Sequence, residues 1–231
     1  MLSLIKTMGF FGAILCLTAC AGGTNNNFRV SKLINSVDVL ADFEKNLDHW
    51  DFKDKGCWKR SKVKGGNHVL NLFKKKSPYH PTFRSPRHVA LLKGNAVGSF
   101  TLDVKAKSTH KDYPHRDLCL FFNYQNEKQF YYVHLGQRAD DKANQIFIVN
   151  HAARKKISIT STRGTPWDKK WHRVRVKRDI KTGMIEIYFD DMKKPAMTAK
   201  DDTFKSGRIG LGSFDDTGYF DEVHLVGEKV K

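Results

Sequence analysis

This sequence of 231 residues carries 41 Lys and Arg residues against 24 Asp and Glu residues, so its formal net charge at pH 7 is +17. So large an excess predicts a polyanionic partner, and the alternative is a solvated basic surface that only keeps the protein soluble. The four cysteines show no C-x-x-C spacing and so give no support to a zinc site, and the length leaves no comfortable room for two sandwich domains.

The N-terminal residues predict export. Residues 1–19 hold one positive charge followed by an apolar run that is too short for a permanent membrane span, which is typical of a signal peptide. The run ends in Leu-Thr-Ala-Cys, which resembles a bacterial lipobox, and the resemblance implies cleavage before Cys20 and its acylation. An ordinary secretory signal is the alternative. Ala21 then implies sorting to the outer membrane, periplasmic or surface face, and residues 20–36 read as a flexible tether.

Removal of residues 1–19 takes away one Lys and no acid, which leaves 40 basic and 24 acidic residues and a net charge of +16. No nucleic-acid motif is present, so nucleic acid is not the expected partner. Outside the cytoplasm the abundant polyanions are sulfated or uronate-containing polysaccharides, lipopolysaccharide and teichoic acids. Membrane contact is expected through the lipid anchor only, and the protein is expected to be a monomer.

Two cysteines remain in the mature chain, Cys57 and Cys119. They would form one disulfide in an oxidising envelope, or stay as two buried thiols, since both stand beside strongly apolar residues. The residues leave both alternatives open.

Short stretches of period-two alternation, separated by turn residues, run through the chain, and helical periodicity is nearly absent. This pattern predicts an all-β fold, an antiparallel two-sheet β-sandwich of the jelly-roll type, occupying residues 37–231 as one domain. The expected strands are 40–44, 68–73, 88–92, 99–107, 118–124, 130–135, 145–149, 156–160, 171–178, 184–189, 208–212 and 220–226.

The C-terminal quarter carries a family resemblance. Residues 171–178, 183–190, 207–211 and 220–223 follow one another as "W-h-x-h-x-h", "G-x-h-x-h-y-h-D", "G-x-h-G-h" and "F-D-x-h" strands, with h an apolar residue. This order resembles the concanavalin A-like (laminin G-like) β-sandwiches. Residues 40–50 also resemble the opening of carbohydrate-binding sandwich modules. The family includes lectins, glycosidases, lyases and adhesion modules, so the resemblance implies the fold and not the activity.

Titratable and aromatic side chains are enriched in the middle of the chain, between residues 84 and 167. Arginines bind carboxylates or sulfates in pairs of hydrogen bonds, and aromatic rings stack on sugars, so this set predicts binding of an anionic polysaccharide. The candidate binding residues are Arg84, His88, His115, Arg116, Gln137, Arg154 and Trp167.

A lyase that cleaves a uronic-acid glycan by β-elimination is the alternative, with Tyr132 and His134 exchanging the protons. The residue types and the strand around Tyr132 are similar to those of jelly-roll alginate lyases. The arginine-rich "R-T-E-L-R" strand and the "Q-[IV]-H" motif of those enzymes are absent. A further alternative is an adhesion module with a protein partner, which an exposed apolar patch would indicate.

Acidic residues give weaker signals. No strand carries the spaced carboxylates of a retaining glycosidase, so that activity is disfavoured. Many sandwiches of this family hold a structural calcium between the first and last strands, where Glu44 and Asp221 stand, and no other cofactor is expected. Asp215 and Asp216 are read as part of a tight turn before Gly218. The basic row Arg173, Arg175 and Lys177 is read as the water-facing side of a strand.

Overall fold

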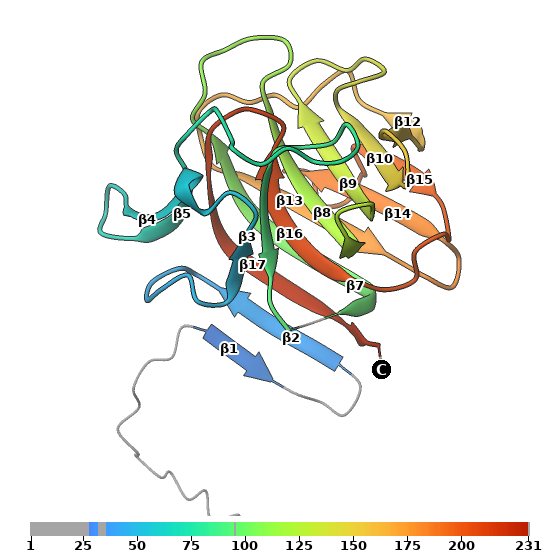
Figure 1. The fold of residues 1–231 in the computed structure, drawn as a ribbon, viewed down its shortest axis with the longest axis horizontal. Coiled ribbons are helices and arrows are strands. Elements are labelled where there is room, and N and C mark those ends of the chain that lie inside the picture. The colour runs from blue at the N-terminus through green and yellow to red at the C-terminus, as the bar shows by residue number, and fades with distance from the viewer. Residues whose placement is uncertain (1–27, 32–35, 95, 231) are drawn as a thin grey trace, which may run out of the picture.

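The computed structural model describes residues 28–31, 36–94 and 96–230. These residues form two antiparallel sheets that stack on one another, and the only helical element among them is the one-turn 3-10 helix Lys55–Cys57 (Figure 1). The predicted all-β, two-sheet sandwich is therefore confirmed. No helix in the described ranges is long and apolar enough to cross a membrane.

The larger sheet has ten strands. Its main path runs β1-β2-β17-β7-β13-β14-β15-β12, and β4 and β5 join it at β17. Its strands are β1 (Phe28–Ser31), β2 (Ser36–Ala41), β4 (Trp58–Lys62), β5 (His68–Leu72), β7 (Val97–Ser108), β12 (Ser158–Ser161), β13 (His172–Arg178), β14 (Met184–Phe189), β15 (Met197–Lys200) and β17 (Gly218–Lys229).

The smaller sheet has seven strands in the order β11-β10-β9-β8-β16-β6-β3. Its strands are β3 (Trp50–Phe52), β6 (His88–Leu92), β8 (Asp117–Asn126), β9 (Gln129–Gly136), β10 (Gln145–Asn150), β11 (Lys155–Lys156) and β16 (Arg208–Ser213). The predicted hairpin of β8 and β9 is present, with Cys119 opposite His134 and Phe121 opposite Tyr132.

The main core lies between the two sheets. On β7 the side chains of Phe100, Leu102, Val104 and Ala106 are buried, as their alternation predicts, and they join apolar residues of both sheets in one cluster. Burial of this cluster supplies the main driving force for folding, because each large apolar side chain removed from water contributes about 1.5–3 kcal/mol.

A second cluster covers the outward face of the seven-stranded sheet. It contains the aromatic residues Phe121, Tyr124, Phe130, Tyr132 and Phe147. The long connection between β5 and β6, residues 73–87 (Figure 1), packs Tyr79 and Phe83 onto it. We call this connection the strap and the sheet face beneath it the covered face.

Glycines on β16 make room for this cluster. A Cβ atom on Gly212 would lie 1.9 Å from the carbonyl oxygen of His88 and 2.7 Å from Cε2 of Phe121. A larger residue therefore cannot occupy the position without moving a neighbouring strand. The prediction that the Gly-Leu-Gly run marks a close approach of backbone is confirmed.

Several boundaries differ from the prediction. Residues 28–31 form β1 and pair with β2, although the sequence predicts a flexible tether there. The strand expected at 40–44 is β2 at 36–41. The alternation did not reveal β3, β4 and β15: β3 and β15 are three and four residues long, and β4 has one apolar residue, Trp58. The predicted signal peptide and Cys20 lie outside the described residues.

Candidate functional site

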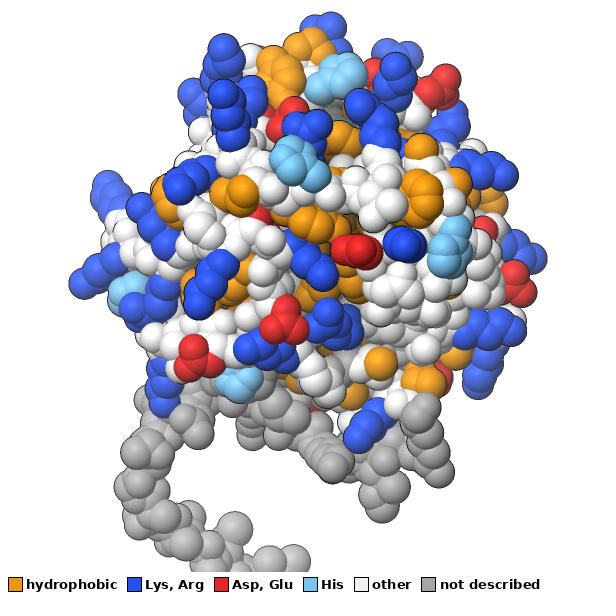
Figure 2. Space-filling model, in the orientation of Figure 1, with side chains coloured by type: hydrophobic (Ala, Val, Ile, Leu, Met, Phe, Trp, Pro, Cys, Tyr) orange, Lys and Arg blue, Asp and Glu red, His pale blue; other side chains and the backbone are white. Residues whose placement is uncertain are grey.

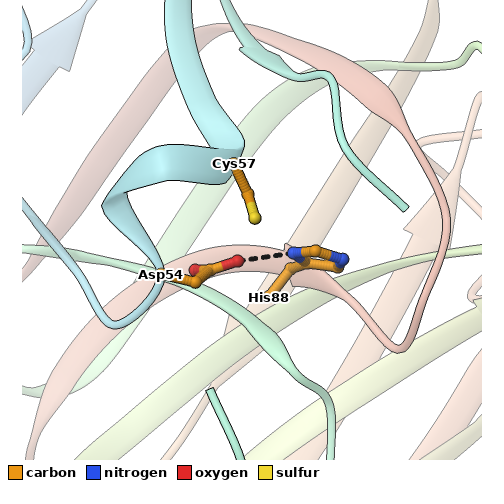
Figure 3. A group of neighbouring side chains, drawn as sticks. All are labelled: Asp54, Cys57 and His88. Atoms are coloured by element: carbon orange, nitrogen blue, oxygen red, sulfur yellow. Dashed lines mark hydrogen bonds and ion pairs between the residues drawn. The ribbon is translucent and has the colours of Figure 1, made fainter. Parts of the chain in front are cut away.

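A buried cluster fixes the strap to the sandwich. Nδ1 of His88 lies 2.5 Å from Oδ2 of Asp54, and Nε2 lies 3.1 Å from the carbonyl oxygen of Lys75 in the strap. Each ring nitrogen of His88 therefore faces an oxygen atom, one on Asp54 and one in the strap. Figure 3 shows the side chain of Cys57 pointing toward this pair, and its thiol reaches the carbonyl oxygen of Lys76 at 3.5 Å. His88 is fully buried in an ion pair that holds the strap, so its position does not fit the predicted contact with a glycan.

Electrostatics support this assignment. Burial alone would raise the pKa of Asp54, but hydrogen bonds from His88 and from the indole of Trp58 outweigh it and lower the pKa. Burial raises the pKa of the Cys57 thiol to about 11 and raises that of Cys119 as well. Both cysteines are free and buried, so of the two alternatives the structure shows buried thiols.

A pocket opens at the rim of the covered face, where the strap meets the end of β16. It has a volume of about 210 Å³ and is lined by His80, Pro81, Arg84, Ser85, Arg87 and Phe214. Phe214 follows directly after β16, and its backbone N–H donates to the buried Asp117 at 3.0 Å. We call this site the arginine pocket.

Arg154 joins the arginine pocket from the loop after β10. Its guanidinium carbon lies 4.4 Å from the ring centre of Phe214 and 4.7 Å from that of Phe147, and its Nη1 donates to the hydroxyl of Tyr132 at 3.0 Å. The backbone N–H of Arg154 donates to the carbonyl oxygen of Arg84 at 3.1 Å. These contacts hold the guanidinium before a ligand arrives, which lowers the entropic cost of binding.

The arginines of this site have no acidic partner in the part of the chain that the structure describes. Arg84, Arg87 and Arg154 form no ion pair within the described ranges, whereas Arg173 and Arg175 share Asp103 and Arg208 contacts Asp51. Figure 2 shows lysine and arginine side chains spread over one whole face of the molecule, among few acidic ones. Three uncompensated guanidinium groups beside one pocket favour an anionic ligand.

The two residues of the lyase hypothesis lie beneath this pocket. Tyr132 is fully buried, and burial raises its pKa. His134 is also buried, and burial followed by the charge of Arg154 lowers its pKa to about 3. Its Nδ1 accepts a hydrogen bond from the backbone N–H of Asn144 at 3.3 Å, so the neutral ring carries its proton on Nε2. Tyr132 has no exposed surface and His134 is only 4% exposed, so neither side chain is placed to exchange a proton with a sugar.

Two buried carboxylates lie next to this pair. Asp117 accepts hydrogen bonds from Phe214 and from the hydroxyl of Ser213, and Asp216 accepts from the hydroxyl of Tyr113 at 2.7 Å and from the N–H of Asp117. Burial, followed by the neighbouring Asp216, raises the pKa of Asp117. This network fixes the backbone at Phe214 and therefore shapes the arginine pocket.

Two predicted binding residues are structural instead. The guanidinium of Arg116 is buried and donates to the hydroxyl and carbonyl oxygens of Ser108 and to the carbonyl oxygen of Trp167. The indole of Trp167 is buried, donates to the carbonyl oxygen of Leu135 at 2.8 Å and packs against His172 and Phe189. Its rings are covered by protein and leave no face for a sugar.

Two further candidates lie on exposed or half-exposed loops. His115 pairs with Asp140 at 3.1 Å, and the amide of Gln137 donates to Asp112. Neither lines the arginine pocket. The structure thus brings together Arg84, Arg154 and Tyr132 from the predicted set, with His134 beneath, and leaves His115, Arg116, Gln137 and Trp167 elsewhere.

The predicted calcium ligands face different partners. Glu44 binds the backbone and ring of His68, and the hydrogen bond from that backbone lowers its pKa. Asp221 accepts from the amide of Asn67 at 2.8 Å, and burial raises its pKa. The carbonyl oxygens of Phe43 and Glu44 accept from the guanidinium of Arg60, which supplies positive charge there. A calcium ion at this seam stays a prediction.

Other groups offer metal-ligating atoms close together. Within the described ranges these are Asp54 with Cys57 and His88, Asp117 with Cys119 and His134, and Asp117 with Asp215 and Asp216. In the first group every polar atom of Asp54 and His88 already has a hydrogen-bond partner, so the geometry is that of a clamp. The third group belongs to the network that fixes Phe214.

Sequence reasoning missed Phe214, His80 and Arg87 as site residues. Phe214 lies in the C-terminal run that we read as scaffold, and a ring just after a strand gave no separate signal. His80 and Arg87 lie in the strap, whose Pro and charged residues predict a loop but not the face that it covers.

No family model and no curated protein sequence matches this chain. Solved structures share its fold. The carbohydrate-binding module CBM66 from Bacillus subtilis is 20% identical over 76% of this chain and 93% of that chain, with a TM-score of 0.52. A protein of unknown function with a galectin-like fold from Bacillus subtilis is 9% identical over 88% and 100%, with a TM-score of 0.52. Winged bean acidic lectin, complexed with methyl-α-D-galactose, is 13% identical over 85% and 99%, with a TM-score of 0.50. At these identities the similarity supports the galectin-like and lectin-like sandwich fold.

Proposed function

We propose that this protein binds an anionic polysaccharide, uronate-containing or sulfated, at the arginine pocket. The observation that carries the proposal is the convergence of Arg84, Arg87 and Arg154 around Phe214, with no ion pair to any of the three among the described residues. Carboxylate or sulfate oxygens would accept paired hydrogen bonds from the guanidinium groups, and the sugar ring would pack against the exposed part of Phe214. The fold shared with a carbohydrate-binding module and a lectin is consistent with this ligand class.

Binding without cleavage is the function that the geometry favours. A β-elimination needs a base within hydrogen-bonding reach of the sugar, and Tyr132 and His134 are both covered. The proposal also keeps the export route expected from the sequence, with acylation at Cys20 and outer-membrane attachment. The tether expected at residues 20–36 is shortened to 20–27, because residues 28–31 form β1. Replacement of Cys20 by Ala should then release the protein from the membrane fraction.

The test is calorimetric titration of the purified protein with oligomannuronate and with size-defined heparin oligosaccharides. Arg84→Ala and Arg154→Ala should each weaken binding about tenfold or more, because a hydrogen bond to a charged group contributes about 1.5–3 kcal/mol. Arg163→Ala is the matched control, since Arg163 does not line this pocket, and it should bind like wild type. Equal affinity of all four proteins would contradict the assignment of the pocket.

The same oligosaccharides test for cleavage. Ultraviolet absorbance of unsaturated uronates should stay flat during prolonged incubation with the protein. A steady rise that Tyr132→Phe or His134→Ala abolishes would show a lyase and overturn the binding-only proposal.

A further inference from the structure

The outer face of the ten-stranded sheet carries aromatic side chains in the open. Tyr219 on β17 stands next to Phe220, which is in the core, so Tyr219 points to the opposite side of the sheet. Trp171 directly precedes β13, and His172 after it is buried, so Trp171 also points outward. The two ring centres lie 6.2 Å apart with an angle of 33° between the rings.

Strand register places these rings in one row. Tyr219 pairs with Lys107 on β7, and Ala106 pairs with His172 on β13, so Lys107 lies between Tyr219 and Trp171. On the other side, Tyr219 pairs with Asn71 on β5, two residues before the exposed Phe73. The row from β5 to β13 crosses three strand spacings, about 14 Å, which is room for a short oligosaccharide.

Lysines flank the aromatic rings of this row. The amino groups of Lys59 and Lys74 lie 4.6 and 5.5 Å from the ring centre of Phe73. Within the described ranges Lys59, Lys74 and Lys107 form no ion pair, whereas Lys105, farther along β7, contacts Glu222 at 2.6 Å and Arg173 and Arg175 share Asp103. Positive charge that has no ion pair in the described ranges therefore lies along the row that also carries the rings.

We propose that Phe73, Tyr219 and Trp171, with Lys59, Lys74 and Lys107, form a second glycan-contact surface, the outer stripe. Its occupant is an anionic oligosaccharide whose rings lie on Tyr219 and Trp171 and whose acidic groups approach the lysines. The ligand class rests on the proposed function, but the site is a different one, on the opposite sheet from the arginine pocket. Two sites on one chain would let the protein hold a polysaccharide at two points and gain avidity.

Tryptophan fluorescence tests the outer stripe directly. Of the four tryptophans, Trp50, Trp58 and Trp167 are 4–6% exposed, whereas Trp171 is 36% exposed, so quenching by acrylamide reports mainly on Trp171. Saturating heparin hexasaccharide or oligomannuronate should protect the emission from acrylamide, and an uncharged maltohexaose should not. The Arg84→Ala/Arg154→Ala double variant should keep the protection, because the arginine pocket is a separate site.

Substitutions give the second measurement. Trp171→Ala and Tyr219→Ala should each weaken calorimetric binding at the stripe about tenfold, the effect expected for one aromatic contact. Lys107→Glu leaves both rings in place and should weaken binding at least as much. If an aromatic variant fails to fold, Lys107→Glu provides the test of the stripe in its place. Lys181→Ala, on the turn between β13 and β14, is the control and should bind like wild type.

The outcomes separate the two proposals. One outcome would overturn the outer stripe and leave the proposed function standing. In that outcome the ligand binds at the arginine pocket, acrylamide still quenches Trp171 fully, and the stripe variants bind like wild type. Absence of binding to every anionic oligosaccharide would overturn both. Protection of Trp171 that the stripe variants weaken would support the outer stripe.

Discussion

The seven-stranded sheet carries Phe121, Tyr132 and Phe147 on its outward face under the strap, whereas the ten-stranded sheet carries the exposed Trp171 and the half-exposed Tyr219 on its outward face. Both faces carry aromatic residues on their strands, with basic residues beside them: on the strands themselves on the ten-stranded sheet, and in the flanking loops on the seven-stranded sheet. The difference is the strap, which turns the first face into a second core and leaves only its rim, the arginine pocket, to ligands. Residue type on a strand therefore does not identify a binding face until its covering is known.

Removing one ring from each face tests most directly whether only the covered face is packed like a core. Phe121→Ala should lower the free energy of unfolding by about 3–5 kcal/mol, because it leaves a cavity among packed rings. Trp171→Ala should cost less than about 1 kcal/mol, because much of its ring is already in water. Urea unfolding measures both values. Similar losses for the two variants would show that the covered face is not a second core.

Loss of the contact between Asp54 and His88, which holds the strap, should have the next largest effect on the free energy of unfolding. Asp54→Asn leaves the buried His88 without its carboxylate and should cost about 3 kcal/mol in unfolding free energy. Since the pKa of Asp54 is lowered in the folded state, its contribution is present above pH ~3.8 and is lost as the pH falls further, through the folded-state pKa.

The exposed pair of Asp51 with Arg208 provides the control for this variant. Asp51→Asn should cost about 0–1 kcal/mol. Fluorescence of a dye that binds exposed apolar surface should rise for Asp54→Asn and not for Asp51→Asn. Unchanged dye binding in both would contradict the role of the clamp in closing the strap.

The pH dependence of stability tests the role of the buried Asp117 at the rim of the covered face. The pKa of Asp117 is raised in the folded state, so the folded protein binds this proton more tightly than the unfolded chain does. Stability of the wild type should therefore fall as the pH rises above ~4 toward the folded-state pKa. Asp117→Asn removes this titrating carboxyl group. Between pH 4 and pH 8 the free energy of unfolding of the variant should therefore rise by at least about 1.4 kcal/mol relative to that of the wild type. Chemical unfolding at a series of pH values measures it, with the exposed Asp202→Asn as control. Parallel profiles for all three proteins would exclude this role.

The smallest effect is expected on the open face. Arg175 makes two hydrogen bonds to Asp103 at 2.8 and 2.9 Å but is partly exposed, so Arg175→Ala should cost about 0.5–1 kcal/mol. The loss should shrink at high salt, because surface ion pairs are screened. A large loss that does not depend on salt would mean that Arg175 contributes through buried packing, as on the covered face, and not through a surface ion pair.

Much of the fold could be predicted from the sequence. Alternation on β7, β13 and β14 and the Gly-Leu-Gly run on β16 each reflect a local physical requirement, namely one face in the core or a close approach of backbone. Three strands escaped prediction: β3 and β15 are three and four residues long, too short to show a period, and β4 has one apolar residue, Trp58, and so shows no alternation.

The site was predicted in part. Arg84 and Arg154 share the rim as expected from their residue types, but Arg116 and Trp167 hydrogen-bond to backbone carbonyls inside the protein. Arginine and tryptophan serve as readily in such interior clamps as in ligand contacts, and sequence spacing does not distinguish the two uses.

The sequence by itself determined the all-β class and the alternation that assigns each strand residue to a face, because a pleated strand has a period of two wherever it lies. Its expectation of an exported, basic protein rests on the N-terminal residues and the charge count. Only the tertiary structure decided which face is open, because the strap reaches the covered face through contacts such as His88 with Lys75 and Phe83 with the aromatic cluster. Those contacts join segments whose meeting depends on how the whole chain packs, and no local pattern encodes that meeting.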